Sequence, residues 1–156
     1  MSREHEKYMA MAIEESRKGL QSGEMPFGSV IVHDGEIIGR AHATLAAGHD
    51  PTAHAEIKAV RDASARLKTK DLSWSTLYTS CEPCPMCCGA ILNARIGTLV
   101  ISGRSETVLA LRGLRTEREY KPDRLARMMN LNLEVIWGVL QDESEDVMRE
   151  YKGWAD

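Results

Sequence analysis

Residues 76–102, TLYTSCEPCPMCCGAILNARIGTLVIS, decide the fold class. Residues 76–80 have the β-branched and aromatic content of a short buried strand. Residues 83–95 predict a turn followed by a helix, with Pro85 at a first helical position, where its missing N–H costs nothing. Residues 98–102 form a second apolar run of strand length. A strand, a helix and a strand in succession favour an α/β layer fold.

The flanking sequence predicts further elements on both sides of this unit. Residues 2–22 predict an amphipathic helix, because apolar residues recur every three or four positions and Gly23 stands where a C-cap belongs. Asp34-Gly35 is typical of a type I′ turn and predicts a hairpin. The other predicted elements are hairpin strands at 29–33 and 36–40, a loop at 44–50, a helix at 51–67 opened by Asp50 and Pro51, a polar connection at 68–75, a short helix at 123–130, a strand at 133–139 and a helix at 141–151. The whole pattern predicts one domain over residues 1–156, with a sheet covered by helices on both faces.

The composition is that of an ordinary globular domain. The 156 residues are 43% apolar and 28% charged, which argues against disorder. A net charge of −3 gives no general attraction to nucleic acid or to an anionic membrane. The uncharged run at 83–94 is too short to cross a bilayer, and the charged first residues lack the apolar core of a secretory signal. We therefore expect a cytoplasmic protein without a membrane partner.

The cysteines give the first indication of chemistry. All four lie within residues 81–88, at Cys81, Cys84, Cys87 and Cys88, so they cannot connect distant parts of the chain as a disulfide framework does. Thiols clustered in this way in a cytosolic chain indicate a metal site. Cys88 follows a candidate ligand and would point about 100° away from it on a helix, so we expect Cys88, like Cys81, to be a bystander.

Two short motifs supply a set of metal ligands. His54-Ala55-Glu56 and Pro83-Cys84-Pro85-Met86-Cys87 each stand at the start of a predicted helix. A two-residue gap lets both thiolates reach one ion about 2.3 Å away, and the His54 imidazole adds a third ligand. Three protein ligands leave one position open, which is typical of a catalytic zinc with water in the fourth place. The sequence therefore predicts one Zn²⁺ per chain, held by His54, Cys84 and Cys87.

Glu56 lies too close to this site to be ignored. Residues two apart on a helix point about 200° apart, so His54 and Glu56 share a site only if it lies off the N-terminal end of their helix. A fourth protein ligand would close the metal, so we assign Glu56 as the proton shuttle. Hydrolytic attack on an amidine-like ring carbon, with Glu56 moving the protons, would give a carbonyl and ammonia.

The paired motifs form the signature of zinc nucleobase deaminases, His-x-Glu followed by Pro-Cys-x-x-Cys. The chain resembles the cytidine and nucleotide deaminase superfamily, most densely over residues 26–103. The string Thr79-Ser-Cys-Glu-Pro-Cys-Pro-Met-Cys87 is most similar to bacterial guanine deaminases, whereas Asp50-Pro-Thr-Ala-His-Ala-Glu56 is equally similar to tRNA adenosine deaminases. The resemblance implies a three-layer α/β/α, cytidine deaminase-like fold with a five-stranded mixed sheet, commonly assembled as a homodimer.

The sequence also departs from this family at substrate-binding positions. Ala43 stands where relatives carry an Asn that binds the substrate, and His42 and Thr44 are the neighbouring candidates for that contact. Guanine deaminases place acidic residues after the fourth strand, but the comparable Ala110-Leu-Arg-Gly-Leu-Arg115 has the opposite charge. The Gly/Ala/Ser-rich turn of the tRNA-editing relatives is absent from this region as well.

The remaining substrate candidates each have an alternative structural role. Phe27 is either a core residue or, as the resemblance suggests, a pocket wall. Trp154 either covers the pocket or caps the core, and Ala55 is a candidate by its place between His54 and Glu56. A basic stretch forms either a solvated surface or a loop that attracts phosphate or an RNA backbone; it comprises Arg104, Arg112, Arg115, Arg118, Lys121, Arg124 and Arg127.

These observations predict a zinc-dependent hydrolytic deaminase of a small amino-substituted heterocycle. The expected substrate is a free nucleobase or nucleoside related to guanine, cytosine or adenine. The first alternative is a tRNA-specific adenosine deaminase, which is the one reading with a nucleic-acid partner. The second alternative is a zinc-binding interaction module without turnover, suggested by Ala43.

Overall fold

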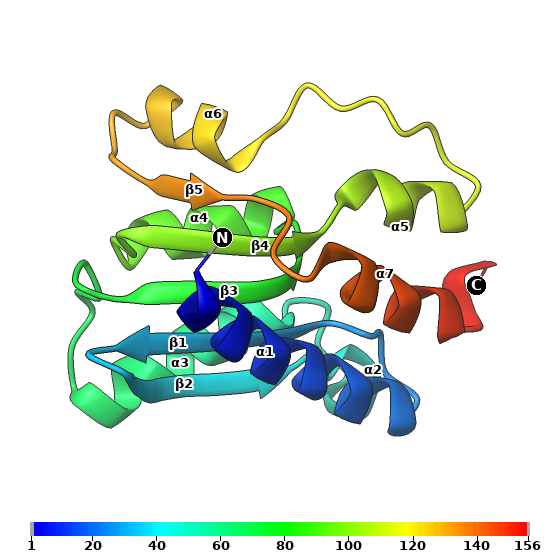
Figure 1. The fold of residues 1–156 in the computed structure, drawn as a ribbon, viewed down its shortest axis with the longest axis horizontal. Helices are drawn as coiled ribbons and strands as arrows, with labels where there is room; N and C mark the ends of the chain where they lie inside the picture. Colours follow the sequence, from blue (N-terminus) through cyan, green and yellow to red (C-terminus); the bar gives the residue numbers. More distant parts are fainter. Residues whose placement is uncertain (1, 156) are drawn as a thin grey trace.

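A five-stranded mixed sheet lies at the centre of the fold, in the order β2-β1-β3-β4-β5 (Figure 1). The computed structural model describes residues 2–155. β1 pairs antiparallel with both β2 and β3, whereas β3, β4 and β5 run parallel to one another. The strands are β1 (Gly28–His33), β2 (Glu36–His42), β3 (Thr76–Cys81), β4 (Thr98–Gly103) and β5 (Glu134–Ile136). The predicted five-stranded mixed sheet is confirmed.

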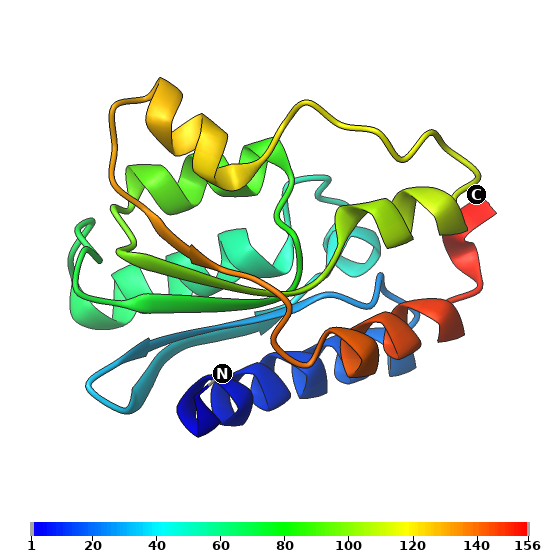
Figure 2. The same cartoon turned by 45° about the horizontal axis from the view of Figure 1, so that its top comes forward.

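Helices cover both faces of this sheet. In Figure 2, α1 and α7 lie on one face, whereas α3, α4 and α6 lie on the other. The helices are α1 (Arg3–Gln21), α2 (Leu45–Gly48), α3 (Ala55–Leu67), α4 (Pro85–Asn93), α5 (Ser105–Leu111), α6 (Pro122–Met128) and α7 (Gln141–Glu150), followed by a 3-10 turn at Gly153–Ala155. No helix among residues 2–155 combines the length and the apolar character that a bilayer crossing requires. The predicted α/β/α layering is confirmed.

The two layers bury alternate residues of the strands. On β1, Ile31 packs with α3 and α4, whereas Val30 and Val32 pack with α1 and α7. On β3, Leu77 and Tyr78 divide between the same two clusters. Successive strand residues point to opposite faces, so a sheet covered on both sides needs apolar residues at successive positions. This requirement explains why the strands read as continuous apolar runs.

Several predicted boundaries were wrong. Helix α3 begins at Ala55 rather than Pro51, because the Asp50 carboxylate accepts hydrogen bonds from the backbone N–H and the hydroxyl of Thr52, at 2.8 and 2.7 Å, and so closes a turn before the helix. The predicted loop at 44–50 contains the short helix α2. The last strand ends at Ile136 instead of residue 139, because Gly138 has a φ of +78° that takes the chain out of the extended conformation.

Gly39 allows β2 and α3 to approach closely. A Cβ at this position would lie 2.4 Å from the carbonyl oxygen of Ala59. We expect Gly39→Val to lower the free energy of unfolding by about 3 kcal/mol, because the clash is with backbone that cannot rotate away. Urea denaturation measures this loss, and Gly89→Ala on α4, where a Cβ meets open space, serves as the control. Equal stability of Gly39→Val and the parent chain would show that the two backbones can move apart.

Candidate metal centre

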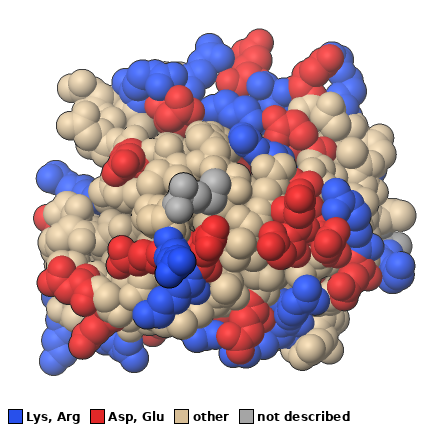
Figure 3. All heavy atoms as spheres, in the orientation of Figure 1, with Lys and Arg blue, Asp and Glu red and all other residues tan. Residues whose placement is uncertain are grey.

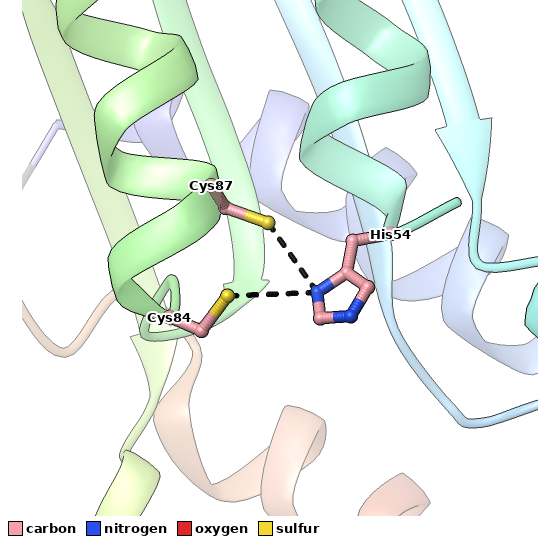
Figure 4. Close-up of side chains that lie close together, drawn as sticks. All are labelled: His54, Cys84 and Cys87. Carbon is pink, nitrogen blue, oxygen red and sulfur yellow. Dashed lines mark hydrogen bonds between the residues drawn. The ribbon is translucent and has the colours of Figure 1, made fainter. Parts of the chain in front are cut away.

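The N-terminal ends of α3 and α4 meet at one place, and the candidate metal ligands lie there (Figure 4). His54 is the N-cap of α3 and Cys84 is the N-cap of α4, both with extended backbone. Cys87 lies in the first turn of α4, which Pro85 opens as predicted. The side chains of these three residues therefore point toward one another from the N-terminal ends of two helices. The site lies off the end of α3, which is where His54 and Glu56 can both reach it.

The distances between these side chains fit a zinc ion. His54 Nδ1 lies 3.7 Å from Cys84 Sγ and 3.4 Å from Cys87 Sγ. Tetrahedral zinc with ordinary bond lengths separates a thiolate sulfur from an imidazole nitrogen by about 3.6 Å. Within residues 2–155, His54, Cys84 and Cys87 are the one group of three candidate ligands whose atoms lie within 4.8 Å of one another.

The three candidate ligands also change one another's pKa values. A hydrogen bond from the Cys87 thiol lowers the pKa of Cys84 to about 4 and raises the pKa of Cys87 itself. The hydrogen bond with Cys84 raises the pKa of His54. Zinc requires both sulfurs as thiolates and the imidazole neutral, so binding displaces these protons.

Glu56 lies beside this group without belonging to it. It is the second residue of α3, and its side chain is buried, which raises the pKa of its carboxyl. The hydroxyl of Thr79, on β3, lies 3.0 Å from Glu56 Oε1 and 3.0 Å from the carbonyl oxygen of Cys81. The carboxyl is thus held at the site by a neighbouring strand and kept out of bulk water.

A pocket of about 270 Å³ opens over these residues. Glu56 and His54 line it on one side, and α5 lines it on the other. Helix α5 was not predicted from the sequence, although Val108 and Leu111 are three residues apart, as on one face of a helix. The lining residues that were not predicted are Met25, Leu45, Glu82, Ser105, Val108 and Leu109. Arg112 and Arg118, from the predicted basic stretch, line the pocket, and so does Cys81, which was expected to be a bystander.

Of the predicted substrate contacts, Phe27 lines the pocket. Its ring also lies 5.9 Å from that of Trp154, so it serves both of the roles considered for it. Trp154 is buried behind Phe27 and donates from Nε1 to the carbonyl oxygen of Met148 at 2.8 Å. Trp154 packs in the core beside the pocket and is not part of its lining.

The other three candidates lie outside the pocket lining. His42 faces away, with Nδ1 3.1 Å from Glu15 Oε2 on α1. Thr44 is the N-cap of the short helix α2, and the fully buried Ala55 is the first residue of α3. Their substrate contacts stay predictions, as does the effect of Ala43, which is buried and donates its N–H to the Phe27 carbonyl oxygen at 3.1 Å.

Comparison with known proteins agrees with this geometry. Residues 2–103 match the model of the cytidine and deoxycytidylate deaminase zinc-binding region. The chain is 35% identical to a chloroplastic tRNA(adenine(34)) deaminase of Arabidopsis thaliana over 92% of its length and 12% of the plant protein. It is 41% identical to a tRNA-specific adenosine deaminase of Aquifex aeolicus over 62% of its length and 64% of that protein. The structure of a guanine deaminase from Nitrosomonas europaea superposes with a TM-score of 0.83 at 29% identity, covering 94% of this chain and 83% of that one.

Proposed function

Because the chain belongs to the cytidine and deoxycytidylate deaminase zinc-binding family, we propose that it is a zinc-dependent hydrolytic deaminase of an amino-substituted nucleobase. The reaction replaces a ring amino group by a carbonyl oxygen and releases ammonia. The observation that carries the proposal is a buried carboxyl, Glu56, beside a His/Cys/Cys zinc site with no fourth protein ligand among residues 2–155. All three ligands and Glu56 line or adjoin one small pocket.

A zinc ion held by His54, Cys84 and Cys87 would supply a water with a pKa lowered to about 7, and the residues around it would bind the base and move the protons. Glu56 takes a proton on its carboxylate, gives it to the ring nitrogen next to the reacting carbon, and helps to protonate the leaving amine. Burial raises the pKa of this carboxyl and so makes its carboxylate a stronger proton acceptor. Phe27 and α5 exclude water from the bound base.

Thr79 positions Glu56 in this scheme. Its hydroxyl holds Oε1, so that the other carboxyl oxygen is left to face the reacting atoms. We expect Thr79→Val, which keeps the shape of the side chain but removes the hydroxyl, to lower kcat by about tenfold with little change in KM. Thr79→Ser should restore most of the loss. A kcat for Thr79→Val equal to that of the parent would show that Glu56 needs no such partner.

The first candidate substrate is adenosine within tRNA. Two of the relatives described above are tRNA adenosine deaminases, and one of them aligns with nearly the whole chain. The comparisons thus favour what was the alternative on sequence grounds. The exposed arginines at the pocket, Arg112 and Arg118, also suit a substrate with phosphates.

The second candidate is a small free base such as guanine. The pocket volume of about 270 Å³ is just below the usual range of ligand sites, about 300–1,000 Å³, and therefore suits a single base. The superposition on a guanine deaminase covers the C-terminal half of the fold as well as the metal motifs.

An ammonia-release assay of the zinc-loaded protein tests the proposal and separates the candidates. The panel comprises free purines and pyrimidines, their nucleosides, a tRNA anticodon stem-loop containing adenosine, pterins and triazines. Ammonia from the stem-loop alone supports the tRNA reading, and ammonia from a free base supports the second candidate. If the fully zinc-loaded protein released no ammonia from any compound, the enzyme proposal would be rejected in favour of a zinc-binding interaction module.

The family resemblance further implies a homodimer, and we propose that the chain associates in this way. Sedimentation equilibrium should give twice the chain mass of 17.4 kDa. A value equal to the chain mass at micromolar concentration would exclude the dimer.

A further inference from the structure

Two arginines without partners stand at the mouth of the pocket. Arg112 follows the last residue of α5, Arg118 lies in the loop at 112–121, and both side chains line the pocket that contains Glu56. Within the described residues, neither guanidinium makes an ion pair or a side-chain hydrogen bond, whereas Arg115 pairs with Glu117 at 2.8 Å in the same loop. Arg115 therefore has an ion-pair partner in its own loop, whereas Arg112 and Arg118 have none among residues 2–155.

The loop that carries them is anchored beside the metal ligands. It runs from α5 to α6 and is yellow in Figure 1. At its end, Lys121 Nζ lies 3.2 and 3.3 Å from the two carboxylate oxygens of the buried Glu82, and 2.7 Å from Glu106 Oε1. Tyr120 donates its hydroxyl proton to the carbonyl oxygen of Pro83 at 3.2 Å. Residues 120–121 therefore hold the loop against residues 82–83, directly before the zinc ligand Cys84.

The charged residues of the pocket lining are two carboxyl groups, Glu56 and Glu82, and two arginines, Arg112 and Arg118. On the face shown in Figure 3, acidic and basic side chains are interspersed, and the whole chain carries −3. Of the two carboxyl groups, Glu82 pairs with Lys121 and Glu56 is buried, so Arg112 and Arg118 are the cationic side chains of the lining without an ion pair among residues 2–155.

Guanidinium groups in this position suit a phosphate. Their planar array of N–H donors matches two oxygens of a phosphate at once, and the charge adds to each hydrogen bond. A pocket of about 270 Å³ has room for one base, so a phosphate attached to that base would lie at the opening.

We propose that Arg112 and Arg118 form a phosphate subsite, so that the substrate of this chain is a base that carries a phosphate. The group belongs either to a mononucleotide or to the backbone of RNA, and its recognition is the same chemistry in both. The inference rests on the proposed function in one respect, because it assumes that a base enters the pocket over Glu56.

Equilibrium binding to the zinc-loaded protein tests the subsite without requiring turnover. The probes are adenosine, guanosine and cytidine, their 5′-monophosphates, and an adenosine-containing RNA stem-loop. We expect phosphate-bearing probes to bind at least tenfold more tightly than nucleosides. The double variant Arg112→Gln/Arg118→Gln should lose this advantage, so that phosphate-bearing probes bind it no more tightly than nucleosides do. For the stem-loop, the slope of log K against log salt should fall by about 2, one for each arginine.

Arg115→Gln is the matched control, because it removes the same charge from the same loop but from a residue outside the pocket lining. If the double variant loses affinity for the monophosphates alone, the substrate is a mononucleotide, and if it loses affinity for the stem-loop alone, the substrate is RNA.

Two results would overturn the subsite. One is equal affinity of the parent for nucleosides and phosphate-bearing probes, and the other is an equal loss of affinity in the double variant and in Arg115→Gln. Ammonia release from a free base together with either of those results would reject the subsite while retaining the deaminase. Phosphate-dependent binding without ammonia release would retain the subsite and reject the deaminase.

Discussion

Glu56→Gln should abolish most ammonia release while the protein keeps about one zinc per chain. The substitution preserves the size of a buried side chain and its hydrogen bond from Thr79, but an amide cannot take and return a proton. General acid–base catalysis contributes about 10²–10⁴-fold, so kcat should fall by that factor or more. Steady-state ammonia release on the best substrate of the panel, together with elemental analysis, measures both quantities.

The zinc content separates two explanations of a loss. A variant that is inactive but fully loaded shows that Glu56 acts on protons, whereas an inactive variant without zinc shows that it supports the metal. Undiminished turnover by loaded Glu56→Gln would refute the assigned role. Glu143→Gln on α7 is a suitable control, because it removes an exposed carboxylate that lies outside the pocket lining.

Cys87→Ser and Cys84→Ser should each lose zinc and, with it, activity. A serine hydroxyl stays protonated at neutral pH and is a poor zinc ligand, so two ligands remain where three are needed. We expect zinc affinity to fall by more than about 100-fold, since even residues that only support a ligand contribute about 10–100-fold. Competition with a chromogenic chelator gives the affinity.

Cys88→Ser provides the matched control for this pair. Cys88 is the neighbour of Cys87 on α4 and is fully buried, but its thiol points to the carbonyl oxygen of Pro122 at 3.9 Å. The variant should therefore bind zinc as the parent does. Zinc loss in Cys88→Ser equal to that in Cys87→Ser would mean that the ligands have been assigned to the wrong thiols.

The metal site was predictable from the sequence because it depends on local geometry. Pro85 fixes the start of α4, and a helix start brings residues three apart to one end, so the spacing of Cys84 and Cys87 was sufficient to place both sulfurs. The same holds for Asp34-Gly35, whose positive φ values of 47° and 77° form the predicted hairpin turn. The order of strands along the chain likewise indicated the layers, although the antiparallel and parallel pairings required the structure.

The pocket was not predictable because it depends on contacts distant in the sequence. The loop with Arg118 and Lys121 reaches the metal motif through contacts distant in the sequence, the ion pair of Lys121 with Glu82, 39 residues away, and the hydrogen bond of Tyr120 to Pro83. Residues 105–111 lack a side-chain N-cap hydrogen bond, so the start of α5 left no capping signal. The start of α3 was predicted too early because Asp50 and Pro51 satisfy the rules for a helix start and for a turn equally well, and the side chain of Thr52 selects the turn.

X-ray absorption at the zinc edge measures directly whether His54, Cys84 and Cys87 hold a zinc ion with one position left for water. Purified protein should contain about one zinc per chain, with two sulfur neighbours at about 2.3 Å, one imidazole nitrogen at about 2.0–2.1 Å and one further light atom. The light atom should be replaced when a base analogue with a metal-binding group is added. A third sulfur neighbour, a shell closed by four protein ligands, or no zinc at all would contradict the account.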